Sequence, residues 1–193
     1  RQVIMQANKN GFFYVLDRRT GELISAEPYV AVTWATGVDP TTGRPIETEQ
    51  SSYLEKAKLM LPGPQGGHNW QPMAFSPKTG LVYLPAHDTP FWYAKEGVFK
   101  VRPGTWNLGL DMDVVVERTE TDTPVAKGQL IAWDPVAKQA RWRVEHEGHW
   151  NGGTLSTYDE AVKLAYEDMY QDTKMIREKR KMKKMHMEHQ QPK

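Results

Sequence analysis

The amino-acid sequence predicts an all-β fold, a partial β-propeller of about three to four blades, followed by a C-terminal α-helical tail. Three observations lead to this prediction. Short runs of aromatic and β-branched residues alternate with turns rich in Gly, Pro and Asp. One strand–turn–strand plan recurs along the chain. The composition changes near residue 157, since all 15 glycines and all 7 tryptophans lie at or before that position.

The predicted strands of the first 157 residues are short and lie next to turn sequences. Asp17–Gly21 closes the first of them, and Ser76–Gly80 precedes another with the same turn chemistry. The predicted strands are 11–16, 81–84, 114–116, 129–133 and 140–144. In this part of the chain only Ser52–Leu61 has the composition of a short helix.

The turn sequences repeat in a recognisable form. The segments Val15–Gly21 and Ala132–Ala137 share the order strand, Asp, turn, and Ala74–Gly80 is a third copy without the Asp. Repetition of such units favours a propeller, in which each blade takes about 40 to 50 residues. Residues 1–157 then make three to four blades, too few to close a ring. Generic hairpin turns in a sandwich or barrel explain the same turns, and the turns alone leave this alternative open.

The last residues, 158–193, form a second region with a different composition. They hold 5 of the 9 methionines, and between Lys174 and Lys184 seven basic residues surround the single acid Glu178. Strong helix formers with acids near Asp159 and bases toward the end predict a helix from about 159 to about 185. We therefore divide the chain into a β body, 1–157, and a charged Lys/Met-rich helical tail, 158–193.

Bulk composition excludes several classes of protein. The 25 Lys+Arg and 24 Asp+Glu residues give a formal net charge of +1, which predicts no general attraction to nucleic acid. The sequence has no run of about 18 apolar residues, so it predicts no transmembrane helix. The chain has no cysteine, so it has no disulfide, no thiolate metal ligand and no Cys-x-x-Cys-His haem motif. It begins without Met, which leads us to expect a processed or truncated start.

Three stretches carry a resemblance to a known family. They are Asn8–Asp17, Gly66–Phe75 continuing to Ala86, and Gly128–Pro135 together with His149–Leu155. In order and spacing they resemble the later part of the propeller domain of the pyrroloquinoline-quinone-dependent alcohol dehydrogenases, quinoproteins and quinohaemoproteins with an eight-bladed propeller. The resemblance covers residues 1–157.

The resemblance implies a cofactor site. Lys9 stands where the family has a lysine that reaches the quinone oxygens, and an ammonium there balances the negative charge that develops on reduction. Asn69 and Trp70 match the family's Asn-Trp pair at the edge of the cofactor. Trp150 lies in the matching late loop and is a weaker candidate for lining the pocket.

The resemblance also implies parts that this chain lacks. The family's Ca²⁺ ligands, Asp general base and cysteine pair belong to segments upstream of Arg1, so no catalytic or metal-binding residue is assigned here. We expect a fragment or subunit of a periplasmic alcohol dehydrogenase that transfers hydride to pyrroloquinoline quinone and is incomplete on its own. Its small alcohol substrate would bind only in a completed pocket. The alternative is a non-catalytic half-propeller that acts as a structural or interaction subunit, with another chain or self-association covering its exposed strand edges.

Overall fold

The computed structural model describes residues 1–148 and 152–156, and these residues are mostly strands. The strands are β1 (Val3–Ala7), β2 (Phe12–Asp17), β3 (Leu23–Pro28), β4 (Ala35–Val38), β5 (Pro45–Glu47), β6 (Lys58–Met60), β7 (Ala74–Ser76), β8 (Leu81–Asp88), β9 (Phe91–Tyr93), β10 (Lys127–Asp134) and β11 (Gln139–Glu147). A 3₁₀ turn, η1 (Glu49–Ser51), and one α-helix, α1 (Met112–Asp122), complete the described elements. The predicted all-β class is confirmed. The predicted helical tail lies outside the described residues.

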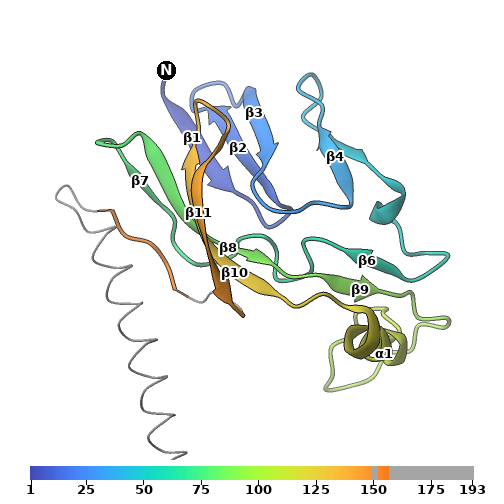
Figure 1. The fold of residues 1–193 in the computed structure, drawn as a ribbon. Helices are drawn as coiled ribbons and strands as arrows, with labels where there is room; N and C mark the ends of the chain where they lie inside the picture. Colours follow the sequence, from blue (N-terminus) through green and yellow to red (C-terminus); the bar gives the residue numbers. More distant parts are fainter. Residues whose placement is uncertain (149–151, 157–193) are drawn as a thin grey trace, which may run out of the picture.

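The strands form two larger sheets and two ribbons, all antiparallel (Figure 1). The three-stranded sheet has the order β1-β2-β3, and the four-stranded sheet has the order β11-β10-β8-β7. The ribbons are β4-β5 and β6-β9. The partial, unclosed propeller expected from the sequence is thus present as two blade-sized sheets and two ribbons. Residues 29–73 and 89–126 hold only the short strands of the ribbons, η1 and α1, and form no further blade.

The recurring turn is built the same way in both larger sheets. The Asp17 carboxylate accepts hydrogen bonds from the backbone N–H groups of Arg19 and Thr20, at 2.8 and 2.9 Å. The Asp134 carboxylate accepts from the equivalent groups two and three residues further on, at 3.0 and 2.8 Å. A side chain that caps its own turn favours this local structure before any tertiary contact forms. A fourth copy, Asp39–Gly43, was not predicted.

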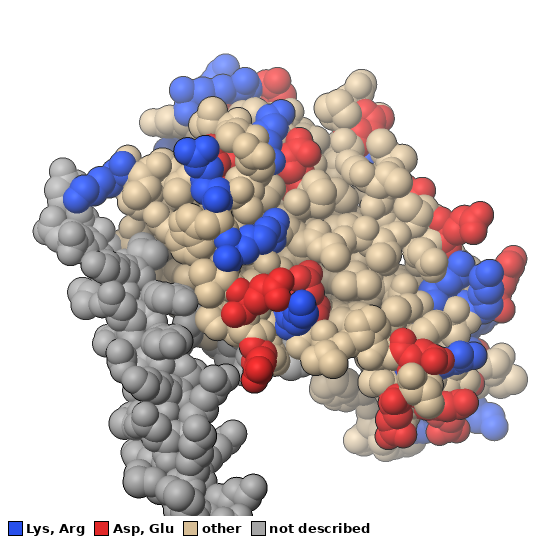
Figure 2. All heavy atoms as spheres, viewed as in Figure 1, with Lys and Arg blue, Asp and Glu red and all other residues tan. Residues whose placement is uncertain are grey.

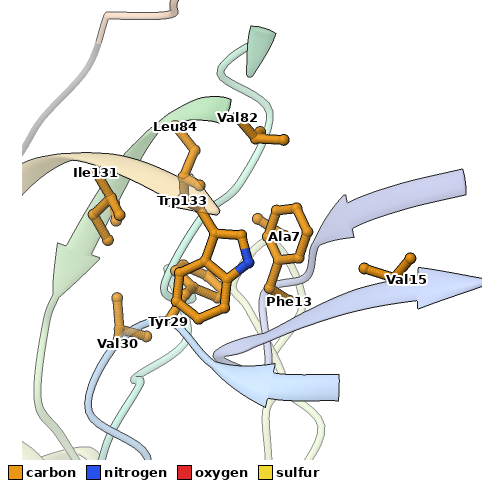
Figure 3. Packing of buried hydrophobic residues seen from close by; sticks show 10 residues of the cluster. Ala7, Phe13, Val15, Tyr29, Val30, Val82, Leu84, Ile131 and Trp133 are labelled. Carbon is orange, nitrogen blue, oxygen red and sulfur yellow. The ribbon is translucent and has the colours of Figure 1, made fainter. Parts of the chain in front are cut away.

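The core lies between the two larger sheets. Phe13 of β2 and Trp133 of β10 face each other with ring centroids 5.4 Å apart, and both are almost completely buried (Figure 3). Tyr29, just after β3, is fully buried in the same cluster. The other buried members are Ala7, Val15, Val30, Val82, Leu84, Ala86 and Ile131. Because both sheets contribute to this cluster, burial of apolar surface joins them into one unit.

The structure corrects two sequence predictions. Residues 114–116 are not a strand; they lie in α1, whose N-cap Asp111 accepts a hydrogen bond from the Val114 N–H at 3.2 Å. The cap and the acid in the first turn outweigh the β-propensity of three consecutive valines. Ser52–Leu61 is not a helix either. It contributes β6, because Lys58–Met60 pair with Phe91–Tyr93, a contact between distant segments that local composition does not reveal.

The surface drawn in Figure 2 mixes the two signs of charge, with acidic side chains gathered at the end of the molecule that holds α1. This mixture agrees with the near-zero net charge. No helix in the described part of the chain is long and apolar enough to cross a membrane.

Candidate cofactor site

Lys9 lies in the turn that joins β1 to β2. The turn is closed by backbone hydrogen bonds from Gly11 N to Asn8 O and from Asn8 N to Phe12 O, both 3.1 Å long. The Asn10 side chain braces it further, because its Oδ1 accepts from the Phe12 N–H at 3.1 Å. Lys9 is exposed in this turn, so its ammonium can extend beyond the end of the sheet.

The Asn69–Trp70 segment belongs to the loop between β6 and β7, and this loop is bonded directly to the Lys9 turn. The Gly67 N–H donates to the Lys9 carbonyl at 3.0 Å. Gly66 has φ +81°, and a Cβ added there would lie 2.8 Å from the Lys9 Cα and Cβ. Such close approach of two backbones requires glycine. The structure therefore brings together two motifs that are about sixty residues apart in the sequence.

The two predicted side chains of this loop differ in exposure. One N–H of the Asn69 amide donates to the Gln65 carbonyl at 3.1 Å, which orients the side chain and leaves its Oδ1 as an acceptor. Trp70 is 74% exposed, so its ring offers a flat apolar surface. Trp150 lies outside the described residues.

Two hydrogen bonds attach the loop to strand β8 of the four-stranded sheet. His68 is buried, and its Nδ1–H donates to the Pro85 carbonyl of β8 at 2.7 Å. The next strand residue but one, His87, donates its backbone N–H to the Gly67 carbonyl at 2.7 Å. Burial lowers the pKa of His68, although its bond to Pro85 partly opposes the shift. A neutral imidazole here fixes the loop without adding charge near Lys9.

Sequence reasoning did not identify Tyr29, which stands behind the turn. Its hydroxyl donates to the Asn8 carbonyl at 2.7 Å, and its backbone N–H donates to the Gly11 carbonyl at 3.0 Å. No local motif marks Tyr29, because its partners are about twenty residues away. The Gly66-Gly67 pair is the one sequence signal for close backbone contact in this region.

The residues at the site suit an anionic, planar ligand. Lys9 offers a positive charge, Asn69 an amide and Trp70 an aromatic surface. Gln71, 4% exposed and two residues from Asn69, has a side-chain oxygen that bonds no described residue. A buried polar atom without a protein partner fits a site that a further group completes. Within residues 1–148 and 152–156, no group of three or more His, Asp or Glu side chains is arranged to hold a metal ion.

Comparison with known proteins identifies relatives, although no family model matches the chain. The chain is 50% identical over 165 residues to the dehydrogenase subunit of a quinone-dependent alcohol dehydrogenase from Gluconacetobacter polyoxogenes. It is 48% identical over 157 residues to a quinohaemoprotein alcohol dehydrogenase, ADH IIB, from Pseudomonas putida. Both alignments cover 81% of this chain and 22% of the relative. The chain thus spans about a fifth of the length of the curated relatives it matches.

Solved structures give the same result. The quinohaemoprotein alcohol dehydrogenase of Comamonas testosteroni superimposes with a TM-score of 0.70 at 42% identity, over 82% of this chain and 24% of the other. A europium-containing methanol dehydrogenase superimposes with a TM-score of 0.62 at 29% identity, over 76% of this chain and 25% of the other.

By its fold, the described chain is part of a β-propeller in which a lysine turn and an Asn-Trp loop meet at one end of two packed sheets. By its relatives, it is a homologue of a segment of the quinoprotein and quinohaemoprotein alcohol dehydrogenases. The resemblance predicted from the sequence motifs is confirmed.

Proposed function

We propose that this chain supplies the Lys9, Asn69 and Trp70 side of a pyrroloquinoline-quinone site in an alcohol dehydrogenase. The observation that carries the proposal is the 3.0 Å bond from Gly67 N to Lys9 O, which joins the two motifs implied by the resemblance. The names of the relatives, quinone and quinohaemoprotein alcohol dehydrogenases, support the same cofactor class.

Each residue has a physical role in this proposal. The bound cofactor supplies an ortho-quinone that accepts hydride from an alcohol. The Lys9 ammonium donates hydrogen bonds toward the quinone oxygens and stabilises negative charge that develops there. Asn69 bonds the polar edge of the ligand, and the exposed ring of Trp70 packs against its apolar surface.

The proposal requires groups that the described residues do not provide. Ca²⁺ ligands and a carboxylate base would come from other segments of the enzyme, as would most of the alcohol pocket. We extend the proposal to the periplasm as the location of the assembled enzyme, which fractionation of cells that produce it would check.

Equilibrium dialysis tests the cofactor site, with the chain, the segments that supply the Ca²⁺ ligands, pyrroloquinoline quinone and Ca²⁺ on one side of the membrane and quinone absorbance as the readout. We expect the wild-type chain to retain cofactor. We expect Lys9→Gln to weaken binding roughly 10- to 100-fold, the effect of losing a hydrogen bond from a charged donor. Lys78→Gln is the matched control, because Lys78 is an exposed lysine in the turn before β8 and lies outside the site. Equal affinities for both variants, or no retained quinone in wild type, would contradict the proposal.

Alcohol oxidation is a separate measurement. With Ca²⁺, cofactor and the segments that supply the metal ligands and base, we expect alcohol-dependent reduction of a dye. Lys9→Gln should reduce this rate, whereas Lys78→Gln should leave it unchanged.

The alternative function, a non-catalytic interaction subunit, has one specific observation in its favour. Among the described residues no strand pairs with the edge of β1 opposite β2, so backbone donors and acceptors remain available along it. Open edges of this kind recruit a strand from another chain. Light scattering after size exclusion tests this alternative: a stable complex or self-association without cofactor binding supports it, and a monomer of 22.1 kDa counts against it.

A further inference from the structure

Tyr29 links the two parts of the proposed site through three contacts of its own. The hydroxyl donates to the Asn8 carbonyl at 2.7 Å, directly before Lys9. The backbone N–H donates to Gly11, at the other end of the same turn, at 3.0 Å. A Cβ added to Gly67 would lie 2.8 Å from the Tyr29 hydroxyl oxygen, so the Asn-Trp loop packs against that same oxygen. One buried side chain thus contacts the Lys9 turn and the Asn-Trp loop together.

Tyr29 is itself held by a chain of hydrogen bonds from the four-stranded sheet. Arg143 of β11 donates from one nitrogen, Nη1, to the Tyr29 carbonyl at 2.7 Å and to Gln129 Oε1 at 3.0 Å. Gln129 of β10 donates to Asp88 Oδ2 at 2.6 Å, and Asp88 Oδ1 accepts from the Ala31 N–H at 3.3 Å. This series of hydrogen bonds begins at the Tyr29 carbonyl and ends at the Ala31 N–H. It therefore fixes the segment that carries Tyr29 at two points.

The Tyr29 hydroxyl stays protonated and therefore remains a hydrogen-bond donor. Burial, with a smaller contribution from the Asp88 charge, raises the pKa of Tyr29 well above its usual value of 10.0. The hydroxyl therefore keeps its proton, and its bond to the Asn8 carbonyl is present throughout the physiological range.

We propose that Tyr29 is a positioning residue, which sets the Lys9 turn against the Asn69–Trp70 loop, and that Arg143, Gln129 and Asp88 keep Tyr29 in place. None of these four residues needs to touch the cofactor. The proposal deepens the proposed function and rests on it for the predicted effect on cofactor affinity; the effect on the geometry of the turn stands without it.

Tyr29→Phe tests the proposal, because it keeps the ring and removes the donor. Tyr83→Phe is the matched control: its hydroxyl donates to Thr79 Oγ1 at 3.1 Å, in the turn before β8, and Tyr83 is buried like Tyr29. The first readout is hydrogen exchange of the Gly67 amide, whose N–H bonds the Lys9 carbonyl, relative to that of the fully buried Ile131 in the central strand β10. This ratio isolates loosening of the turn from a general loss of stability.

We expect the Gly67-to-Ile131 exchange ratio to rise about tenfold in Tyr29→Phe, the effect of one lost buried hydrogen bond, and to stay unchanged in Tyr83→Phe. Cofactor affinity should fall by a similar factor in Tyr29→Phe only. If Tyr29→Phe does not fold, Arg143→Lys takes its place, because a single ammonium cannot reproduce the guanidinium geometry; it should shift both readouts in the same direction.

The outcomes separate this proposal from the one it rests on. An unchanged exchange ratio in Tyr29→Phe, or an equal change in Tyr83→Phe, overturns the positioning role. So does unchanged cofactor affinity in a chain whose exchange ratio has risen. A wild-type chain that binds no cofactor overturns the proposed function, and the exchange ratio alone then decides whether Tyr29 positions the turn.

Discussion

The two larger sheets share a plan but differ at one edge. The Asp17 turn joins β2 to β3 and the Asp134 turn joins β10 to β11, so β1-β2-β3 corresponds to β8-β10-β11. In the four-stranded sheet, β7 covers the far edge of β8 through the pairs Ala74–Tyr83, Phe75–Val82 and Ser76–Leu81. The corresponding edge of β1 has no such strand among the described residues. The repeated unit is therefore three strands around one turn, and the fourth strand distinguishes a covered blade from an open one.

The largest expected change in stability concerns the contact that joins the two sheets into one folding unit. Trp133→Ala removes a side chain that is 2% exposed between the sheets and faces Phe13. We expect it to lower the free energy of unfolding by about 3–5 kcal/mol. Trp142→Ala is the control, because Trp142 is 40% exposed and contacts Tyr83 of its own sheet; we expect a loss of about 1 kcal/mol or less. Urea denaturation measures both, and equal losses would show that the contact between sheets contributes little.

The next test concerns the open edge itself. The Gln2 carbonyl accepts from Arg18 N, and Asn8 N donates to Phe12 O, so the even-numbered residues of β1 bond toward β2. The N–H groups of Val3, Met5 and Ala7 then point away from β2. Ala7 is buried, so the test uses Val3 and Met5, whose amides we expect to exchange about 100-fold faster than those of Ile4 and Gln6.

The four-stranded sheet supplies the comparison for that experiment. Val82 and Tyr83 of β8 pair with β7 on one side and β10 on the other, so both amides should be protected. Uniform protection along β1 would mean that a strand of another chain or segment covers it, and would sharpen the interaction-subunit alternative.

Sequence reasoning identified what is encoded locally. Asp and Gly at fixed positions build the turns through their own backbone, so these turns were predicted together with β2, β8, β10 and β11 beside them. Strands β3 and β7 and the Asp39 copy of the turn were missed. The one described helix was missed because three valines conceal a capped helix start at Asp111.

The site was predicted only in part for the same reason. Lys9 and the Asn69–Trp70 pair are parts of contiguous motifs, which family resemblance can locate, and the structure places their two segments in contact. The residues behind the site act through bonds between distant parts of the sequence. Tyr29 bonds Asn8 across 21 residues, and Arg143 bonds Tyr29 across 114. Such contacts leave no local pattern, so only the folded chain reveals them.

Acid should weaken the attachment of the site loop to the four-stranded sheet. Burial lowers the pKa of His68, so between that lowered value and the ordinary 6.5 the unfolded chain binds more protons than the folded chain. Stability is therefore full above about pH 6.5 and declines as the pH falls below it. Urea denaturation from pH 8 to 5 should show this slope, and His68→Gln should reduce it.

Two other groups must be separated from His68 in that experiment. Burial also lowers the pKa of His146, so His146→Gln is the matched variant and should leave the His68 part of the slope in place. The pKa of Asp17 is lowered chiefly by its bond to Arg1, and then by the turn N–H groups. Its contribution is lost only at much lower pH, below the ordinary range of a carboxyl. An unchanged slope in His68→Gln would contradict the assignment.

The smallest expected effect comes from the left-handed position of the two matching turns, where one turn has glycine and the other has a residue with a side chain. Gly21 ends the Asp17 turn with φ +77°, whereas the exposed Lys138 ends the Asp134 turn with φ +58°. A side chain in this left-handed conformation costs roughly 1–2 kcal/mol, and glycine avoids that cost but gains freedom in the unfolded chain. Lys138→Gly should therefore raise the free energy of unfolding by about 0.5–1 kcal/mol, and Gly21→Lys should lower it by a similar amount. Denaturation of the two variants side by side measures whether the turns are energetically equivalent; a loss of stability in Lys138→Gly would mean that the lysine side chain contributes a contact that the three-stranded sheet does not have.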